Sequence, residues 1–524
     1  MLLLVTAAGW KALLLIQNVV PFNADEAVVG LMARHILAGA RPIFFYGQAY
    51  MGSLDAFWVA LGFSIFGSQV WVIRLMQLLL YLATIITTVL LGRAATGSRK
   101  AGWIAGVLMA LPTVNVTLYT TASLGGYGEA LLIGNLILLT GMRLLRELDH
   151  GMFAWLTWAG LGFLGGLGLW THGMTLVYLA PVGLAVLIHL LRTKGWLQTG
   201  RFWGCVAAVA AGFILGSLPW WIYAFQAGWT GLVGELFGSA VSVESGSWLE
   251  RTGAHLVNLV LLGASATFGL RPPWNVTWLA LPLLPFVLLF WIVVIIWMAK
   301  QARTNRVLAL MIGVCLTLAT VFIITSFGVD PSGRYFTPLA APLAVGAGVF
   351  ITEKLTHKWL SVGLVGLVIV FNGWGTLQCA QANPPGLTTQ FDPTTVVDSR
   401  NLGELADFLH DQGEMRGFTT YWVSYPLAFI SDEELIYTPR LPYHNDLRYT
   451  HRDDRIAAYD EIIGRSERLA YITAQNPTLD EALRAGLTRL QVTWKEKSLG
   501  DYRVYYHFSR CVTPEELPEI FNEP

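Results

Sequence analysis

Residues 2–37 read LLLVTAAGWKALLLIQNVVPFNADEAVVGLMARHIL, and they join an apolar stretch to a segment that opens with two adjacent carboxylates. Residues 2–20 have the length and composition of a helix that crosses a membrane, with Lys11 as their one charged residue. The carboxylates are Asp25 and Glu26. They either start a second helix or serve a reaction at the membrane surface, and the rest of the chain bears on both interpretations.

The composition of the whole chain indicates the class of protein. Of its 524 residues, 54% are hydrophobic and 13% are charged, whereas soluble domains contain about 25% charged residues. This composition predicts a polytopic membrane protein. The net charge is zero, so nothing suggests nucleic acid as a partner. About eleven stretches are long and apolar enough to span a membrane, namely 2–20, 70–92, 101–119, 128–146, 153–171, 174–192, 202–224, 274–299, 307–327, 337–352 and 359–377.

Basic residues cluster in alternate loops between these stretches. Short loops rich in lysine and arginine face the cytoplasm in most membrane proteins. The opposite loops around 120–127 and 172–173 contain neither residue. We therefore predict that the acidic pair, the loop 225–273 and the C-terminal region face outward. The basic loops hold Arg93, Arg99 and Lys100, then Arg143 and Arg146, then Arg192, Lys194 and Arg201, then Lys300, Arg303 and Arg306, and finally Lys354 and Lys358.

A membrane domain is predicted over 1–377 and a small soluble α/β domain over 391–524. Residues 378–390 between them contain the Pro, Gly and Thr residues typical of a linker. The soluble part contains three neighbouring aromatic residues, Tyr421, Trp422 and Tyr425. Contact with a substrate and a place in the core of a strand are equally consistent with their pattern. The expected elements are a helix at 403–413, strands at 417–423 and 468–474, a helix from a Thr478–Glu481 capping box to Gly486, and a β-hairpin at 488–508.

The segment that opens with the acidic pair has the pattern of a helix ended by Gly39. Asn23 is a favoured N-cap and Glu26 stands where a capping box places its carboxylate. This local role does not explain Asp25, which shares the apolar face, because a carboxylate in apolar surroundings costs free energy unless something uses it. A catalytic and a structural role for Asp25 have equal weight on this pattern. This helix and the stretch 53–67 are predicted to lie in the membrane interface.

Further polar residues lie near the outer ends of predicted spans. Glu129 is either a first-turn carboxylate that suits the helix dipole or a substrate ligand. His172 lies in a tight outer turn, where a structural role is more common than a site role. Arg334 is the one basic residue of its outer loop and suits a phosphate, although it also fits a headgroup anchor beside Tyr335. Lys11 is long enough to extend outward, where it too would suit a phosphate.

Several short motifs, in their order along the chain, resemble one family of membrane enzymes. They are DEA at 25–27, PIFFYGQAYMGSLDA at 42–56, GSQVWVIRLMQLL at 67–79, GLWTHGMTLVYLAP at 168–181, GRYFTPLAAP at 333–342 and TTYWVSYPLAFIS at 419–431. They resemble the bacterial relatives of protein O-mannosyltransferases and of the lipid A aminoarabinose transferase, which are C-type (GT-C) glycosyltransferases. The resemblance implies a polytopic α-helical membrane protein with about 11 transmembrane helices, interface helices in the first outer loop, and a small C-terminal α/β domain.

The resemblance also implies an activity. The family transfers a sugar, with inversion, from a polyprenyl-phosphate donor to a hydroxyl acceptor on the outer face of the cytoplasmic membrane, which here would be that of a prokaryote. Asp25 matches the general base and Glu26 its acidic neighbour. Arg334 and Tyr335 match the place where the donor phosphate is handled, with Lys11 as a further phosphate ligand. Candidates for substrate binding are Gln48, Tyr50, Asp55, Glu129 and His172.

The expected partners are the polyprenyl-phosphate sugar, the lipid bilayer, and an acceptor that is a protein, a lipid or a glycan. No cofactor is implied, and no metal, because the sequence holds no convincing ligand cluster. The main alternative is a transporter or flippase of lipid-linked saccharides. That class tends to place ionisable groups near the middle of the membrane and to show repeated halves, whereas here they gather at one face. A non-catalytic sensor or scaffold would leave the acidic pair and Arg334 unexplained.

Overall fold

The computed structural model describes residues 1–193, 199–237, 246–382, 386–390 and 396–521, which form two compact units. The first unit consists of Met1–Gln17, Tyr50–Asp55 and Arg74–Ala382. The second consists of Asn18–Ala49, Ala56–Ile73 and Asn383–Pro524. Most of the first outer loop therefore groups with the C-terminal region, unlike the expected linear division. Parts of the expected linker, soluble domain and loops lie outside the described residues, namely 383–385, 391–395, 194–198 and 238–245.

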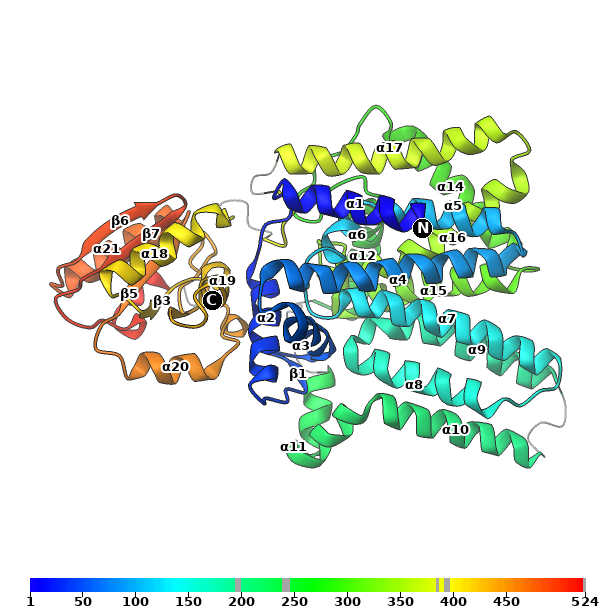
Figure 1. Cartoon of the computed structure of the whole chain (residues 1–524), viewed down its shortest axis with the longest axis horizontal. Coiled ribbons are helices and arrows are strands. Elements are labelled where there is room, and N and C mark those ends of the chain that lie inside the picture. Colours follow the sequence, from blue (N-terminus) through cyan, green and yellow to red (C-terminus); the bar gives the residue numbers. More distant parts are fainter. Residues whose placement is uncertain (194–198, 238–245, 383–385, 391–395, 522–524) are drawn as a thin grey trace. The chain divides into compact units, whose positions relative to one another are not determined.

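Helices build the first unit, and its long helices lie side by side with roughly parallel axes in Figure 1. Such apolar helices bury against one another and leave their remaining apolar surface for lipid. Their bounds are α1 Leu2–Ile16, α4 Val70–Thr96, α5 Arg99–Ala110, α6 Val114–Tyr119, α7 Tyr127–Asp149, α8 Trp155–Thr171, α9 Leu176–Arg192, α10 Gly200–Gly216, α11 Leu218–Phe237, α12 Trp248–Asn258, α13 Ser265–Thr267, α14 Leu284–Gln301, α15 Arg306–Ile324, α16 Ala340–Lys354 and α17 Lys358–Ala382.

Among the described residues, seven helices are long and apolar enough to cross a membrane, and one bent pair adds an eighth. The chain thus has the expected multi-pass helical class with fewer clear spans than the eleven or so expected from length. Two expected spans are short helices, since α1 has 15 residues and α8 has 17. The stretch expected at 101–119 is divided into α5 and α6 beside Pro112, because proline lacks the backbone donor that a continuous helix needs.

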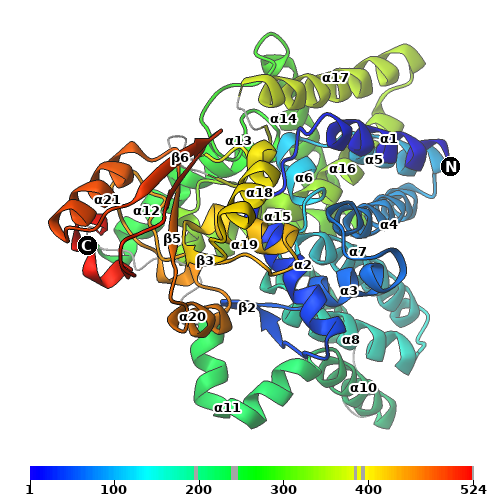
Figure 2. The ribbon, with the colours of Figure 1, turned by 60° about the vertical axis from the view of Figure 1, so that its left-hand side comes forward.

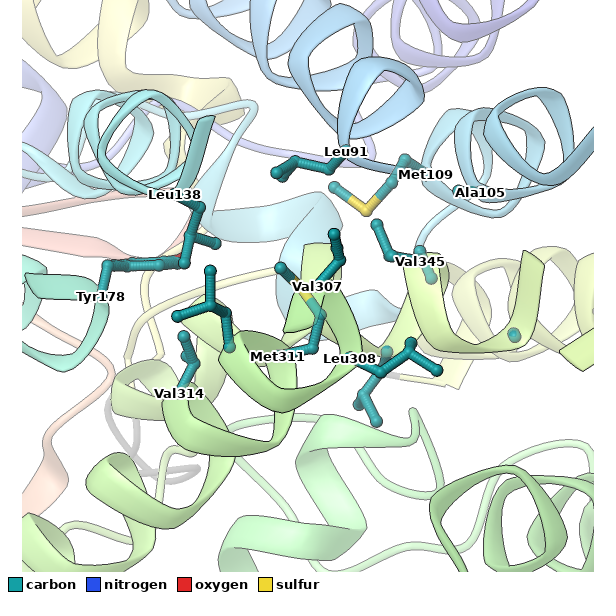
Figure 3. Packing of buried hydrophobic residues seen from close by; sticks show 14 of the residues in the cluster. Leu91, Ala105, Met109, Leu138, Tyr178, Val307, Leu308, Met311, Val314 and Val345 are labelled. Carbon is teal, nitrogen blue, oxygen red and sulfur yellow. The ribbon is translucent and has the colours of Figure 1, made fainter. Parts of the chain in front are cut away.

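The core of the first unit consists of apolar side chains from helices far apart in sequence. Figure 3 shows side chains from α4, α5, α9, α15 and α16 gathered in one cluster. Among them, Leu91, Tyr178, Met311 and Val345 are almost completely buried. Close packing of this kind makes the helices rigid supports for the loops at their ends.

Helices α8 and α10 approach each other through glycines. A methyl group added at Gly162 would lie 2.1 Å from the carbonyl oxygen of Val209, and one added at Gly212 would lie 2.1 Å from that of Ala159. Small residues at such spacing let membrane helices come into backbone contact. The contact fixes α8, which ends at Thr171 directly before His172.

The second unit contains a five-stranded sheet of order β4-β3-β5-β7-β6. Strand β3 is parallel to both of its neighbours, and β7 is antiparallel to both of its own. Figure 2 shows α18 and α21 on opposite sides of the strands. The bounds are α2 Ala24–Leu37, β1 Phe44–Phe45, β2 Gln48–Gly52, α3 Leu54–Phe66, α18 Leu402–Gln412, β3 Arg416–Phe418, α19 Tyr421–Ile430, β4 Ile436–Thr438, α20 Ala457–Gly464, β5 Ala470–Ala474, α21 Pro477–Arg489, β6 Lys495–Leu499 and β7 Tyr502–Tyr506.

Three of the elements expected in this region are confirmed, and two expectations are wrong. The helix α18, the strand β5 and the hairpin β6–β7 form where their patterns predict them. The strand expected at 417–423 ends at Phe418, and Tyr421 begins α19 instead. The expected capping box at the start of α21 is replaced by Asn476, whose side chain accepts a hydrogen bond from the backbone of Leu479. Gly486 does not end this helix but lies inside it, where it packs tightly against Leu517.

Candidate active site

The acidic pair lies in the first turn of α2, as the sequence predicts. The side chain of Asn23 accepts a hydrogen bond of 3.1 Å from the backbone N–H of Glu26, so the expected N-cap is confirmed. Both carboxylates are placed where the partial positive charge of a helix N-terminus favours them. The helix stops at Leu37, two residues before Gly39.

Burial within α2 differs from the expected single apolar face. Ten of its fourteen residues are buried, so the helix packs against other parts of the protein on most sides. The side chain of Glu26 is fully buried, whereas Asp25 is only half-buried. Asp25 is therefore the more accessible of the two acids.

Asp25 is bound by a residue of the C-terminal region. The hydroxyl of Tyr421 donates a hydrogen bond of 2.5 Å to Oδ1 of Asp25. The guanidinium of Arg455 lies 5.3 Å from the centroid of the Tyr421 ring. Burial raises the pKa of the nearby Asp453 to about 7, an effect that Arg455 opposes and the charge of Asp25 increases. These four residues form one charged cluster in the second unit, and we call it the Asp25 cluster.

In the first unit, Asp55 is held by hydrogen bonds to both carboxylate oxygens. The amide of Gln77 donates to Oδ1 at 2.8 Å, and the hydroxyl of Ser123 donates to Oδ2 at 2.6 Å. The backbone N–H of Gly126 also donates to Oδ2, at 3.3 Å. Asp55 is 1% exposed. Its expected role in substrate binding is not supported, because these partners already satisfy it, and it anchors the loop before α7 instead.

Glu129 lies in the first turn of α7, which follows two glycines in left-handed conformations. Its side chain is 3% exposed, and its charge interacts with that of Asp55. Its two carboxyl oxygens are buried, and the side chains of Asp55 and Gln77 interact with the carboxyl group. Because a carboxyl group can accept several hydrogen bonds, Glu129 is a candidate for binding the hydroxyl groups of a ligand.

His172 caps the short turn Gly173–Thr175, and its Nδ1 accepts a hydrogen bond of 3.2 Å from the backbone N–H of Met174. Burial and, to a smaller extent, the positive charge of Arg334 lower the pKa of His172 to about 4. The ring is therefore neutral near pH 7. Because Nδ1 is the acceptor, the proton belongs on Nε2, which has no partner among the described residues. His172 thus presents a buried N–H donor. The centroid of its ring lies 4.9 Å from that of the Tyr127 ring.

Arg334 forms an ion pair of 2.6 Å with Asp330, four residues earlier. Its guanidinium also lies 5.0 Å from the ring centroid of Tyr335, which is buried against Phe327. The side chain of Arg334 is 30% exposed, so a ligand can reach it. A phosphate at this position would compete with the Asp330 carboxylate or share the guanidinium with it.

Lys11 does not extend outward as expected. Its side chain is 2% exposed, and its Nζ donates to the carbonyl oxygen of Thr120 at 2.5 Å and to the hydroxyls of Thr120 and Thr121 at 2.8 Å each. All three of its donors are used by the end of α6. Direct phosphate binding would break these bonds, and only the charge of Lys11 remains available to a ligand.

The structure brings several expected site residues together in the first unit. The loop 120–127 contacts both Lys11 and Asp55 and leads into Glu129, while the backbone of His172 bridges to Met51. Asp25 and Glu26 belong to the second unit, as does Gln48 at the start of β2. The side chain of Tyr50 lies outside the described part of the structure.

Sequence reasoning missed the two other charged members of the Asp25 cluster, Asp453 and Arg455. No local pattern marks them, because Asp453 ends a short 3-10 turn and Arg455 lies in the irregular segment that follows. The sequence allows Tyr421 to be either a substrate contact or a strand residue. In the structure it is not a strand residue, since it starts α19 and binds Asp25.

Comparison with known proteins identifies the fold. No protein-family model matches the chain, and no curated protein sequence matches it. The structure is similar to that of ArnT from Cupriavidus metallidurans in the apo state, with a TM-score of 0.58 and 14% identity over 99% of this chain and 100% of that chain. The same protein bound to undecaprenyl phosphate matches with a TM-score of 0.57 and 13% identity over 98% of each chain. The chain therefore has the fold of ArnT, and the polytopic α-helical fold with a small C-terminal α/β domain that the motifs imply is confirmed.

Proposed function

We propose that this chain is an inverting glycosyltransferase that moves a sugar from a polyprenyl-phosphate donor to a hydroxyl acceptor. One observation supports this proposal more strongly than the other observations. Asp25 is a half-buried carboxylate at a capped helix N-terminus, and a tyrosine hydroxyl binds one of its oxygens. A carboxylate held in this way is suited to accept a proton from an attacking hydroxyl.

The donor class is supported by the fold. ArnT, whose fold this chain shares over nearly its whole length, has been solved with undecaprenyl phosphate bound. We therefore propose a polyprenyl-phosphate sugar as the donor, with a hexose or a pentose as the sugar. Glu26 is the acidic neighbour that helps to place Asp25, because it fills the buried side of the same helical turn.

The proposed reaction needs one base and no general acid. Asp25 takes the proton of the acceptor hydroxyl as its oxygen attacks the anomeric carbon from the face opposite the phosphate. The bond between that carbon and the phosphate oxygen breaks, and the phosphate leaves with the electron pair. A phosphate is a good leaving group, so neighbouring cations and N–H donors are sufficient to stabilise the charge that develops on it.

Within the first unit, Arg334 is the proposed ligand of the donor phosphate. Arginine binds phosphate through paired, charge-assisted hydrogen bonds. His172 supports this assignment, because its Nε2–H is a second buried donor and its pKa is lowered by the charge of Arg334. Glu129 is proposed to accept hydrogen bonds from substrate hydroxyls.

The distribution of basic loops supports an outward-facing reaction. The helices α7, α9, α14 and α16 each carry a basic residue in the last turn. By the positive-inside tendency these ends face the cytoplasm, which leaves the opposite ends for the site. We propose the cytoplasmic membrane of a prokaryote as its location, with a protein, lipid or glycan acceptor.

The test uses the purified full chain in lipid with undecaprenyl-phosphate-linked hexoses and pentoses. Release of undecaprenyl phosphate, followed by mass spectrometry, is the expected result, and the Asp25→Asn variant should lose it. Asp407→Asn is a matched control, because Asp407 is an exposed carboxylate on α18. Movement of an intact lipid-linked sugar across the bilayer, with no cleavage, would instead identify a flippase and contradict the proposal.

A further inference from the structure

We propose that the C-terminal region is part of the active site, and that Tyr421 is the positioning residue that holds the Asp25 carboxylate toward the acceptor. This inference rests on the proposed function, in which Asp25 is the base. It assigns a catalytic purpose to a region that the sequence alone presents as a separate soluble domain.

The contact leaves one side of the carboxylate free. Tyr421 donates to Oδ1 of Asp25 at 2.5 Å. Among the described residues, no protein group donates to Oδ2, and Asp25 is half-buried rather than sealed. One oxygen is therefore fixed while the other remains open to an acceptor hydroxyl. Fixing one oxygen sets the rotamer of the carboxylate and so the direction from which it can take a proton.

Tyr421 is itself held rigidly. It is the first residue of α19, and its side chain is 3% exposed. Its ring packs against Trp422 at 5.0 Å and lies under the guanidinium of Arg455 at 5.3 Å. Burial and the neighbouring charge of Asp25 raise the pKa of Tyr421 well above its usual value. The hydroxyl consequently stays protonated and remains a donor.

The packing of α2 against α19 sets the alignment of the two residues. A methyl group added at Gly30 would lie 2.5 Å from the ring of Phe429, so only glycine permits this approach. Four residues after Gly30, Arg34 donates to the carbonyl oxygen of Phe429 at 2.8 Å and pairs with Asp432 at 2.8 Å. The guanidinium also lies 4.1 Å from the Phe429 ring centroid. The contact between Asp25 and Tyr421 is thus one part of an extended, specific interface.

The test compares Tyr421→Phe with Tyr437→Phe in the release of undecaprenyl phosphate from an undecaprenyl-phosphate sugar. Both changes remove only a hydroxyl. Tyr437 is a suitable control because it is fully buried in the same unit, and its hydroxyl donates at 2.5 Å to the backbone of Glu414 rather than to Asp25. We expect Tyr421→Phe to lower kcat about tenfold with the KM for the donor unchanged, as for the loss of one hydrogen bond to a charged group.

A second readout separates a positioning role from a structural one. Tyr437→Phe should leave kcat close to that of the wild type when activity is expressed per folded protein. In an Asp25→Ala background, Tyr421→Phe should cause no further loss of residual activity or of Tm, because the partner is already absent.

The outcomes distinguish the inference from the function on which it rests. Wild-type release of undecaprenyl phosphate with equal kcat for both tyrosine variants would overturn the role of Tyr421 and leave the proposed function standing. Additive losses of Tm for Asp25→Ala and Tyr421→Phe would also overturn it, by showing that the contact does not couple the two residues. If the wild-type protein cleaves none of the supplied donors, the proposed function fails first, and the inference fails with it.

Discussion

Asp25 and Tyr421 are separated by 396 residues in the sequence and joined by a hydrogen bond of 2.5 Å. This bond joins the first turn of α2 to the first turn of α19. The candidate base is therefore supported by a region that composition marks as separate from the membrane helices.

Asp25→Asn is expected to reduce transfer by at least about a hundredfold, because general-base catalysis contributes roughly 10²–10⁴ in rate. Asparagine has nearly the same shape and can still accept from Tyr421, so the fold should be retained. Turnover of a polyprenyl-phosphate sugar in lipid, measured beside the Tm, checks this expectation. Near-normal turnover would remove Asp25 from the mechanism.

Asp453→Asn is expected to stabilise the protein at pH 8 and to have little effect at pH 4. Burial raises the folded-state pKa of this carboxyl from its ordinary value of 3.8 to about 7. The folded protein therefore holds a proton that the unfolded chain has lost, and stability decreases as pH rises between these values. Asparagine avoids the cost of ionisation, which is on the order of 2–4 kcal/mol. Thermal unfolding in detergent between pH 4 and 9 measures the difference, and an equal Tm shift at every pH would contradict it.

The two nitrogen atoms of His172 can be tested separately. In His172→Asn the side-chain oxygen can still accept from Met174, as Nδ1 does, but the Nε2–H donor is lost. In His172→Gln the longer amide can restore a donor near Nε2 but not the cap. If Nε2–H contacts the donor phosphate, the Asn variant should raise the donor KM several-fold, by the loss of one hydrogen bond. The Gln variant should instead mainly lower the Tm. Because the pKa of His172 is about 4, neither effect should change between pH 6 and 8.

Arg334→Ala is expected to raise the KM for the donor about tenfold or more, as for the loss of a charge-assisted contact. Asp330→Asn provides the matched comparison, because it removes the carboxylate that now pairs with Arg334 at 2.6 Å. This change should leave the donor KM unchanged or lower it. Equal donor KM values for the wild type and Arg334→Ala would assign Arg334 to the anchoring of the loop alone.

Asp55→Ala is expected to destabilise the first unit by roughly 2–4 kcal/mol, because three buried donors lose their acceptor. Its effect on turnover should follow the fraction of folded protein. A large loss of kcat with an unchanged Tm would return Asp55 to the group of substrate-binding residues.

Local patterns were sufficient for several features of the chain. The capped start of α2 at Asn23, the strand β5 and the hairpin β6–β7 depend on neighbouring residues, and they form as predicted. The number of spanning helices was less predictable, because a break such as that beside Pro112 and the bend of 68° after α10 depend on packing as well as on hydropathy.

The sequence by itself determined the membrane class and the ArnT-like fold, since these depend on composition and on the order of short motifs along the chain. Only the tertiary structure decided which polar groups are already satisfied and which remain open. Lys11 is bound by residues 109 and 110 positions away, Asp55 by a hydroxyl 68 positions away, and Asp25 by a tyrosine 396 positions away. Partners so far apart leave no local pattern, because the free energy of a buried charge depends on what the fold brings to it.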